Sequence, residues 1–87
     1  MIITWRQAVT AAMKRHGETW ADVIGQAPPE GGWDVEFYDG YGIPEGKPFT
    51  VWTQDRVYFP VSYDGEESAG SVARNPCSEV TEHIGGG

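Results

Sequence analysis

The chain has one cysteine, no long hydrophobic run and few basic residues, and each shortage excludes a class of protein. Cys77 has no partner for an internal disulfide, which favours a reducing compartment. No apolar run approaches the roughly 20 residues that a membrane-spanning helix needs, and the opening residues do not have the pattern of a signal peptide. We therefore expect a cytoplasmic protein that does not enter a membrane.

Basic residues are scarce: six Lys and Arg stand against thirteen Asp and Glu, so the net charge is −7. Residues 1–17 contain Arg6, Lys14 and Arg15 and no acid, a net charge of +3, which leaves −10 for residues 18–87. A field of that sign repels phosphate backbones and attracts basic surfaces. The sequence therefore predicts a protein partner that is basic or handles nucleic acid, and no direct binding of DNA or RNA.

The residues that carry chemistry do not form a known catalytic, metal-binding or nucleotide-binding pattern. Cys77, His16 and His83 are spaced unlike zinc ligands, and no pair of carboxylates is singled out as an acid and a base. The glycines never form a phosphate-binding loop. Cys77 near a helix start is a formal nucleophile, but we favour a partly buried, inert thiol. We predict no enzymatic activity, no cofactor and no metal.

The opening residues predict a helix. Thr4 and Gln7 form a capping box, because the Thr4 hydroxyl accepts from the Gln7 amide while the Gln7 side chain reaches back. Apolar residues then recur at helical spacing over residues 5–16, and Gly17 provides a left-handed stop.

A second capping box, from Thr19 to Asp22, predicts a second, short helix that ends before Gly25. A helix-turn-helix reader of DNA is disfavoured, because the second helix is short and carries Glu18 and Asp22 where such a reader needs Arg, Lys, Asn or Gln.

We expect one α+β domain, in which an N-terminal helix and a short second helix pack on a three-stranded antiparallel β-meander. Its predicted parts are a helical part over 4–25, a Pro/Gly-rich linker over 26–32, an irregular segment over 33–48, the β-meander over 49–74, a C-terminal helical turn over 75–84 and a frayed tail over 85–87.

The clearest β signal is a hairpin over residues 49–63, and its register has two solutions. A two-residue loop sets Trp52 opposite Val57, whereas a three-residue loop pairs Val51 with Phe59. We prefer the three-residue loop, because it buries the aliphatic residues together on one face.

That register makes Trp52 and Tyr58 cross-strand neighbours on the outer face of the hairpin. Rigid aromatics rimmed by carboxylates suit a partner that presents Arg or Lys, through cation–π contact and charge pairing. The alternative is that the helices cover this face and bury the aromatics. The predicted partner-binding residues are Trp52, Tyr58, Tyr38, Tyr41, Glu66, Glu67 and Asp39.

Several short motifs resemble a family of small acidic phage and prophage proteins without a known activity. They are the opening Thr-Trp helix, Phe49-Thr50-Val51-Trp52-Thr53, Val57-Tyr58-Phe59-Pro60-Val61, Tyr63-Asp64-Gly65, Arg74-Asn75-Pro76-Cys77 and His83-Ile84-Gly85-Gly86. The resemblance implies a phage setting in the cytoplasm of a host cell, and it carries no site residues across.

Two functions fit a small acidic protein of that kind. The first is an inhibitor of a host defence protein, for example an anti-CRISPR protein, acting through an acidic surface. The second is an accessory or oligomeric binding module that uses the aromatic hairpin face. Opposite charges on residues 1–17 and on the remainder are compatible with a homo-oligomer.

Overall fold

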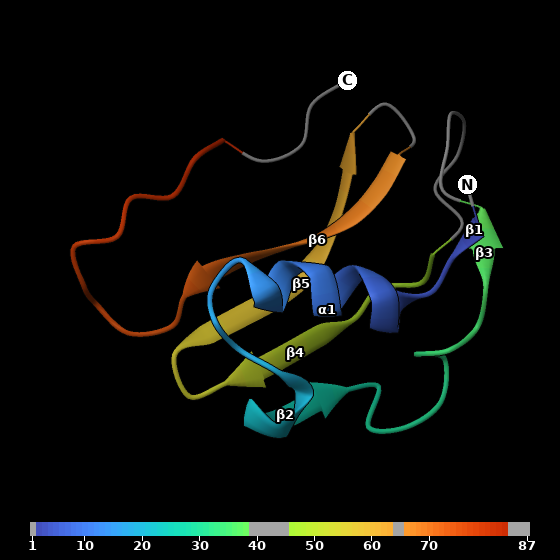
Figure 1. Ribbon diagram of the computed structural model, residues 1–87, viewed down its shortest axis with the longest axis horizontal. Coiled ribbons are helices and arrows are strands. Elements are labelled where there is room, and N and C mark those ends of the chain that lie inside the picture. Colours follow the sequence, from blue (N-terminus) through green and yellow to red (C-terminus); the bar gives the residue numbers. More distant parts are fainter. Residues whose placement is uncertain (1, 39–45, 64–65, 84–87) are drawn as a thin grey trace.

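The computed structural model describes residues 2–38, 46–63 and 66–83 (Figure 1). In chain order its elements are β1 (Ile2–Ile3), α1 (Trp5–Lys14), the 3-10 turn η1 (Trp20–Asp22), β2 (Val23–Ala27), β3 (Phe37–Tyr38), β4 (Thr50–Thr53), β5 (Arg56–Tyr63) and β6 (Glu66–Ala73). The predicted α+β class is confirmed, although strands outweigh helix. The predicted frayed tail over 85–87 lies outside the described residues.

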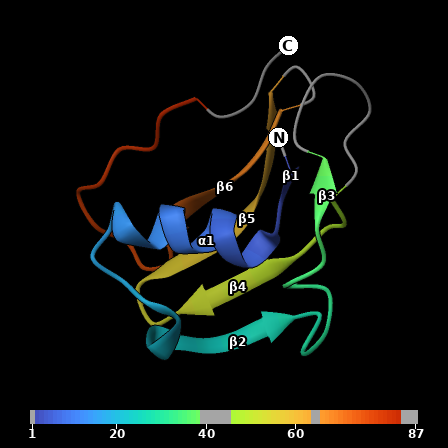
Figure 2. The same cartoon turned by 45° about the vertical axis from the view of Figure 1, so that its right-hand side comes forward.

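The strands form two antiparallel sheets. β2, β4, β5 and β6 lie in that order in a four-stranded sheet, while β1 and β3 pair separately near the start of α1. In both ribbon views α1 lies across one face of the larger sheet, called here the inner face (Figures 1 and 2). Within the segment predicted to be irregular, 33–48, the described residues include the short strand β3.

The first helix follows its sequence signals. Gln7 N donates to Thr4 Oγ1 at 3.1 Å and Thr4 N donates to Gln7 Oε1 at 3.0 Å, so the predicted capping box is confirmed. The helix ends at Lys14, a little before its predicted end, and Gly17 adopts a φ of 70°, which a residue without Cβ adopts most readily.

The second helix was predicted wrongly. The Thr19–Asp22 capping box is present, with Thr19 N donating to Asp22 Oδ2 at 2.8 Å, but it starts only one 3-10 turn. The chain continues as strand β2 from Val23. Val23 and the next residue are β-branched and Gly25 follows them, which favours a strand over a helix, and β4 lies alongside as the pairing partner. The predicted linker therefore begins inside an edge strand, and the three-stranded meander was wrong because β2 adds a fourth strand.

The hairpin between β4 and β5 has the other of the two registers considered above. Trp52 lies opposite Val57 and Val51 opposite Tyr58, so the preferred three-residue loop was wrong. The buried Thr53 explains the tighter turn, because its hydroxyl oxygen accepts from the amides of Asp55 at 3.3 Å and Arg56 at 2.9 Å. These bonds close the loop on Gln54 and Asp55.

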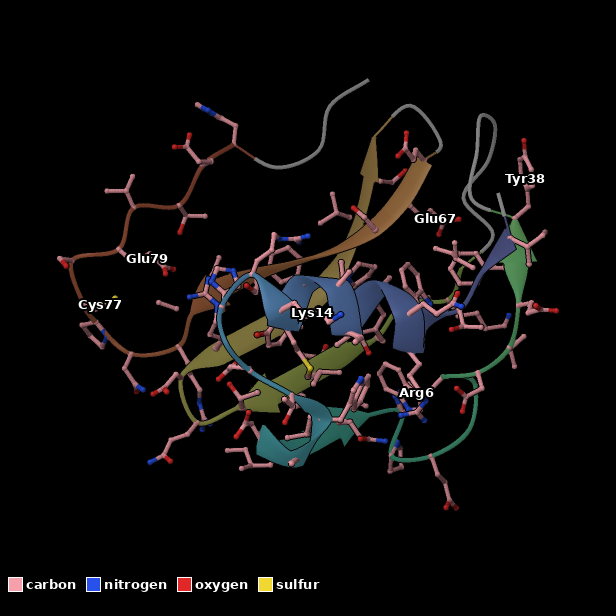
Figure 3. All side chains as sticks on the ribbon, in the orientation of Figure 1. Arg6, Lys14, Tyr38, Glu67, Cys77 and Glu79 are labelled. Atoms are coloured by element: carbon pink, nitrogen blue, oxygen red, sulfur yellow. The ribbon has the colours of Figure 1, made fainter. Side chains whose placement is uncertain are left out.

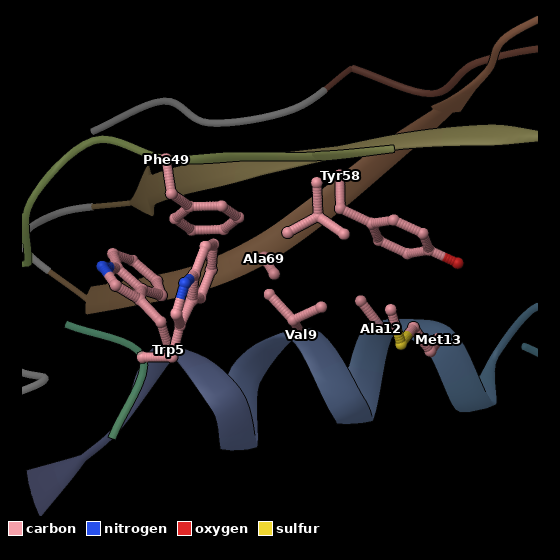
Figure 4. Packing of buried hydrophobic residues seen from close by; sticks show 9 residues of the cluster. Trp5, Val9, Ala12, Met13, Phe49, Tyr58 and Ala69 are labelled. Carbon is pink, nitrogen blue, oxygen red and sulfur yellow. The ribbon is translucent and has the colours of Figure 1, made fainter. Parts of the chain in front are cut away.

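The core lies between α1 and the inner face of the sheet (Figure 4). Trp5 is its aromatic centre at the N-terminal end of the helix, with its ring 4.7 Å from those of Phe37 and Phe49. Its indole N–H donates to Lys47 O at 2.9 Å, so its polar atom is satisfied. The buried apolar residues are Trp5, Val9, Ala12, Met13, Trp33, Phe49, Val51, Tyr58 and Ala69.

The C-terminal helical turn was also predicted wrongly. Residues 74–83, called here the C-terminal segment, are irregular and every one of them is exposed. Asn75 and Pro76 form a plausible helix start, but a short helix needs tertiary packing and this stretch buries no apolar face. Arg74 and Asn75 instead bond to the β4–β5 turn, at Thr53 O (3.0 Å) and Gln54 O (3.2 Å).

Candidate functional site

The two aromatics predicted to share one face lie on opposite faces of the sheet. Tyr58 is fully buried against α1, so it was wrongly placed on an accessible surface. The alternative, burial beneath the helical part, is correct for this residue. Trp52 points to the other face, called here the outer face, and is partly exposed.

The remaining predicted partner-binding residues are also dispersed. Tyr38 is exposed at 49% on β3, and Glu66 is exposed at the start of β6. Glu67 is buried and accepts from Gly46 N at 3.0 and 3.2 Å, which contradicts its predicted place on an acidic surface. Figure 3 shows Tyr38 and Glu67 at one end of the molecule and Glu79 at the other. Tyr41 and Asp39 lie outside the described residues.

The outer face gathers a set of apolar side chains that the sequence reasoning did not group. Strand alternation places five partly exposed residues there: Trp52, Val57, Phe59, Val61 and Val72. α1 packs on the inner face, and no described helix packs on the outer one. With the two-residue loop, the alternation of side chains along β5 would have placed Val57, Phe59 and Val61 on the same face as Trp52.

The two outer aromatics are each paired with a glycine on the neighbouring strand. Trp52 lies opposite Gly25, and Phe59 lies opposite Gly70. A Cβ on Gly25 would lie 3.4 Å from Trp52 Cε3, so the indole rests against the bare backbone. Pairs of this kind are a recurrent device in β-sheets, in which an aromatic side chain covers a glycine on the neighbouring strand.

A separate polar cluster lies on the inner face, beyond the C-terminal end of α1. Arg56 is buried at its centre, and its Nη1 donates to Glu79 Oε1 at 2.7 Å while its Nε donates to Ser71 Oγ at 2.8 Å. The hydrogen bond from Arg56 holds the pKa of Glu79 below its usual value. The same bond raises the pKa of Arg56, so the pair stays charged.

Glu18 completes this cluster from the other side of Arg56. Its Oε1 accepts from the Tyr58 hydroxyl at 2.5 Å and from the Thr53 hydroxyl at 3.1 Å. Burial, together with the bond to Glu18, raises the pKa of Tyr58, so the phenol stays protonated as a donor. Glu18 thus accepts from two hydroxyls, and among the described residues of the cluster no nucleophile lies next to a free base.

Two hollows meet at this cluster. One, of about 520 Å³, lies between the end of α1, β6 and the C-terminal segment. The other, of about 440 Å³, is lined by His16, Arg56 and four carboxylates: Glu18, Asp22, Asp55 and Glu79.

Among the described residues, no three His, Cys, Asp or Glu side chains gather in positions suited to a metal ion. Cys77 is an exposed free thiol on the C-terminal segment, not the partly buried one that was expected.

His16 makes the stability depend on pH. Burial, reinforced by the charge of Arg56, lowers the pKa of its imidazole below the ordinary value of about 6.5. The unfolded chain therefore takes up the proton more readily, and the contribution of His16 is complete above pH about 6.5 and declines as the pH falls below it. We expect His16→Gln to lose less stability than the wild type between pH 7 and pH 5, measured by urea unfolding. An equal loss in both proteins would contradict this role.

The described chain contains no helix that is both long enough and apolar enough to cross a bilayer. No protein-family model, curated protein or solved structure matches this chain.

Proposed function

We propose that this protein is a binding module that acts without catalysis, and that it docks a protein partner on the outer face of its four-stranded sheet. The observation that carries the proposal is the set of five partly exposed apolar residues there, over which no helix of the described residues lies. Partly exposed apolar side chains that gather on one face of a sheet are typical of a protein-interaction site.

The charge distribution supports the choice of this face. The chain carries a net charge of −7, yet the strand register assigns only one charged residue, Glu66, to the outer face. Glu66 lies at one end, opposite Tyr63, away from the centre formed by Trp52 and Phe59. Interface centres are depleted of charge and enriched in aromatics, which is the pattern seen here.

The test compares matched variants in affinity capture from cell extracts at low and high salt. We expect Trp52→Ser and Phe59→Ser to weaken capture of the partner by roughly 30-fold, the effect of losing a central aromatic contact. Ala11→Ser, on the exposed side of α1, is the control and should bind like the wild type. High salt should leave the wild-type complex intact, because apolar contacts are little screened.

Loss of capture counts only if each variant still unfolds cooperatively with a near-native circular dichroism spectrum. A partner recovered equally well by the wild type, Phe59→Ser and Ala11→Ser would refute docking on the outer face.

A second candidate function is inhibition of a basic, nucleic-acid-handling host protein, the hypothesis that the acidic charge of the chain suggests. The hollow lined by Glu18, Asp22, Asp55 and Glu79 favours it, since it would receive an Arg or Lys side chain. The charge reversals Asp22→Lys and Asp55→Lys, both at exposed positions, test it. Binding that these changes abolish, and that high salt also abolishes, would support this candidate against the outer face.

A further inference from the structure

Arg56 is a buried guanidinium whose carboxylate partner comes from an exposed segment. Its side chain is only 9% exposed, and Ser71 holds it through Oγ and the backbone carbonyl, at 2.8 and 3.4 Å. The other hydrogen bond that its side chain makes to the described residues runs from Nη1 to the carboxylate of Glu79. A guanidinium has five N–H donors, and the described residues accept from three of them. The other two N–H groups are therefore left for a further acceptor.

The C-terminal segment is held to the fold lightly. It runs out beyond the end of β6 (Figures 1 and 3), and Val80 within it is 82% exposed. Past Asn75, the side-chain hydrogen bond that ties it to the rest of the described chain is the one that Arg56 donates to the Glu79 carboxylate. Segments with so few buried contacts open at a small cost in free energy.

The 520 Å³ cavity beneath this segment has a charge opposite to that of the protein. Arg15, His16 and Arg56 line it from the folded body, and the body contributes no acid to its lining. Both of its carboxylates, Glu79 and Glu82, belong to the C-terminal segment. Displacement of the segment therefore opens the cavity and leaves a cationic surface on the body of a protein of net charge −7.

The cavity also has an apolar wall. Val61 and Ala69 line it from the sheet, next to the hydroxyls of Ser68 and Ser71. A ligand with a short hydrocarbon body and an anionic end matches this lining.

We propose that this cavity binds a small organic acid, whose carboxylate replaces that of Glu79 on Arg56. The resident Glu79 carboxylate shows which chemical group the guanidinium accepts, and the two unused N–H donors permit a two-point contact with the incoming carboxylate. The C-terminal segment is then an internal competitor that covers the site until an acid displaces it. Of the five outer-face residues the cavity shares only Val61, and the proposal does not depend on docking on the outer face.

The experiment is a titration with succinate at pH 7.5 and constant ionic strength, followed by the NMR signals of the His16 and His83 imidazoles. We expect Glu79→Ala to bind succinate roughly tenfold more tightly than the wild type, because a competitor bound about nine-tenths of the time weakens the apparent affinity tenfold. Glu82→Ala is the matched control, since Glu82 lines the same cavity without contacting Arg56. It should gain much less affinity.

Two further measurements test whether the ligand is a carboxylic acid and whether Arg56 binds it. Inorganic phosphate should bind Glu79→Ala more weakly than succinate does, and the change Arg56→Lys in the Glu79→Ala background should remove the gain. The proposal fails if Glu79→Ala binds succinate no better than the wild type, if Glu82→Ala gains as much, or if phosphate binds more tightly than succinate. Because Glu79 and Glu82 are both exposed, these comparisons hold even if Arg56→Lys unfolds.

Discussion

Gly46→Ala is expected to destabilise the protein by about 3 kcal/mol, by overfilling a packed site and separating a partly buried hydrogen-bonded pair. A Cβ at this position would lie within 3.0 Å of the side chains of Trp5, Glu67 and Phe37. Two of these are aromatic rings in the core region, and the third is the carboxylate that accepts from the Gly46 amide. For a domain of this size the melting temperature should fall by roughly 10–20 °C, measured by circular dichroism.

Gly25→Ala is the control for this prediction. Its Cβ would meet only Trp52 Cε3, at 3.4 Å, and its backbone does not need a positive φ. We expect a change of less than about 1 kcal/mol. Similar melting temperatures for the two variants would contradict the close packing of residue 46 against Trp5 and Glu67.

Trp5→Ala should cost about 3–5 kcal/mol, the usual penalty for truncating a buried tryptophan. The change removes ring contacts with Phe37 and Phe49 and leaves Lys47 O without its donor. Because small domains are stable by only about 5–15 kcal/mol, this variant should be partly unfolded in low concentrations of urea. Far-ultraviolet circular dichroism is the suitable probe, since removing a tryptophan also changes the fluorescence.

Trp52→Ala is the matched comparison, because the same side chain is removed from the outer face. We expect it to cost only about 1 kcal/mol. Equal penalties at Trp5 and Trp52 would mean that the outer face is packed as tightly as the core, which would also remove the basis for docking there.

The parts of the fold that local chemistry determines were predictable from the sequence. The capping box at Thr4 sets the helix start through bonds between residues three apart, and Gly17 sets its end. The hairpin, too, was recognisable, since Gln54 and Asp55 separate two β-rich runs.

The parts that depend on distant contacts were not predictable. Val23 and Ile24 are compatible with either helix or strand, and pairing with β4 decides for the strand. The hairpin register depends on the hydroxyl of Thr53, and the pattern of apolar residues carries no information about this hydrogen bond. Likewise, nothing near Glu79 in the sequence indicates that a buried Arg56, 23 positions earlier, would hold it. The candidate site was missed for the same reason, because one wrong register exchanges the faces of every residue on a strand.

The shape of β2 limits how this protein can associate. β2 is an edge strand of an open sheet. The unpaired backbone groups of an edge strand can pair with a strand of another molecule, and this is the step from which β-aggregates grow. Its pairing with β4 is already interrupted between Val23 and Gly25, and Pro28 and Pro29 follow directly and offer no amide hydrogen. Growth of the sheet by edge-to-edge addition is therefore disfavoured on this side, which leaves the broad surface of the sheet for the docking proposed above.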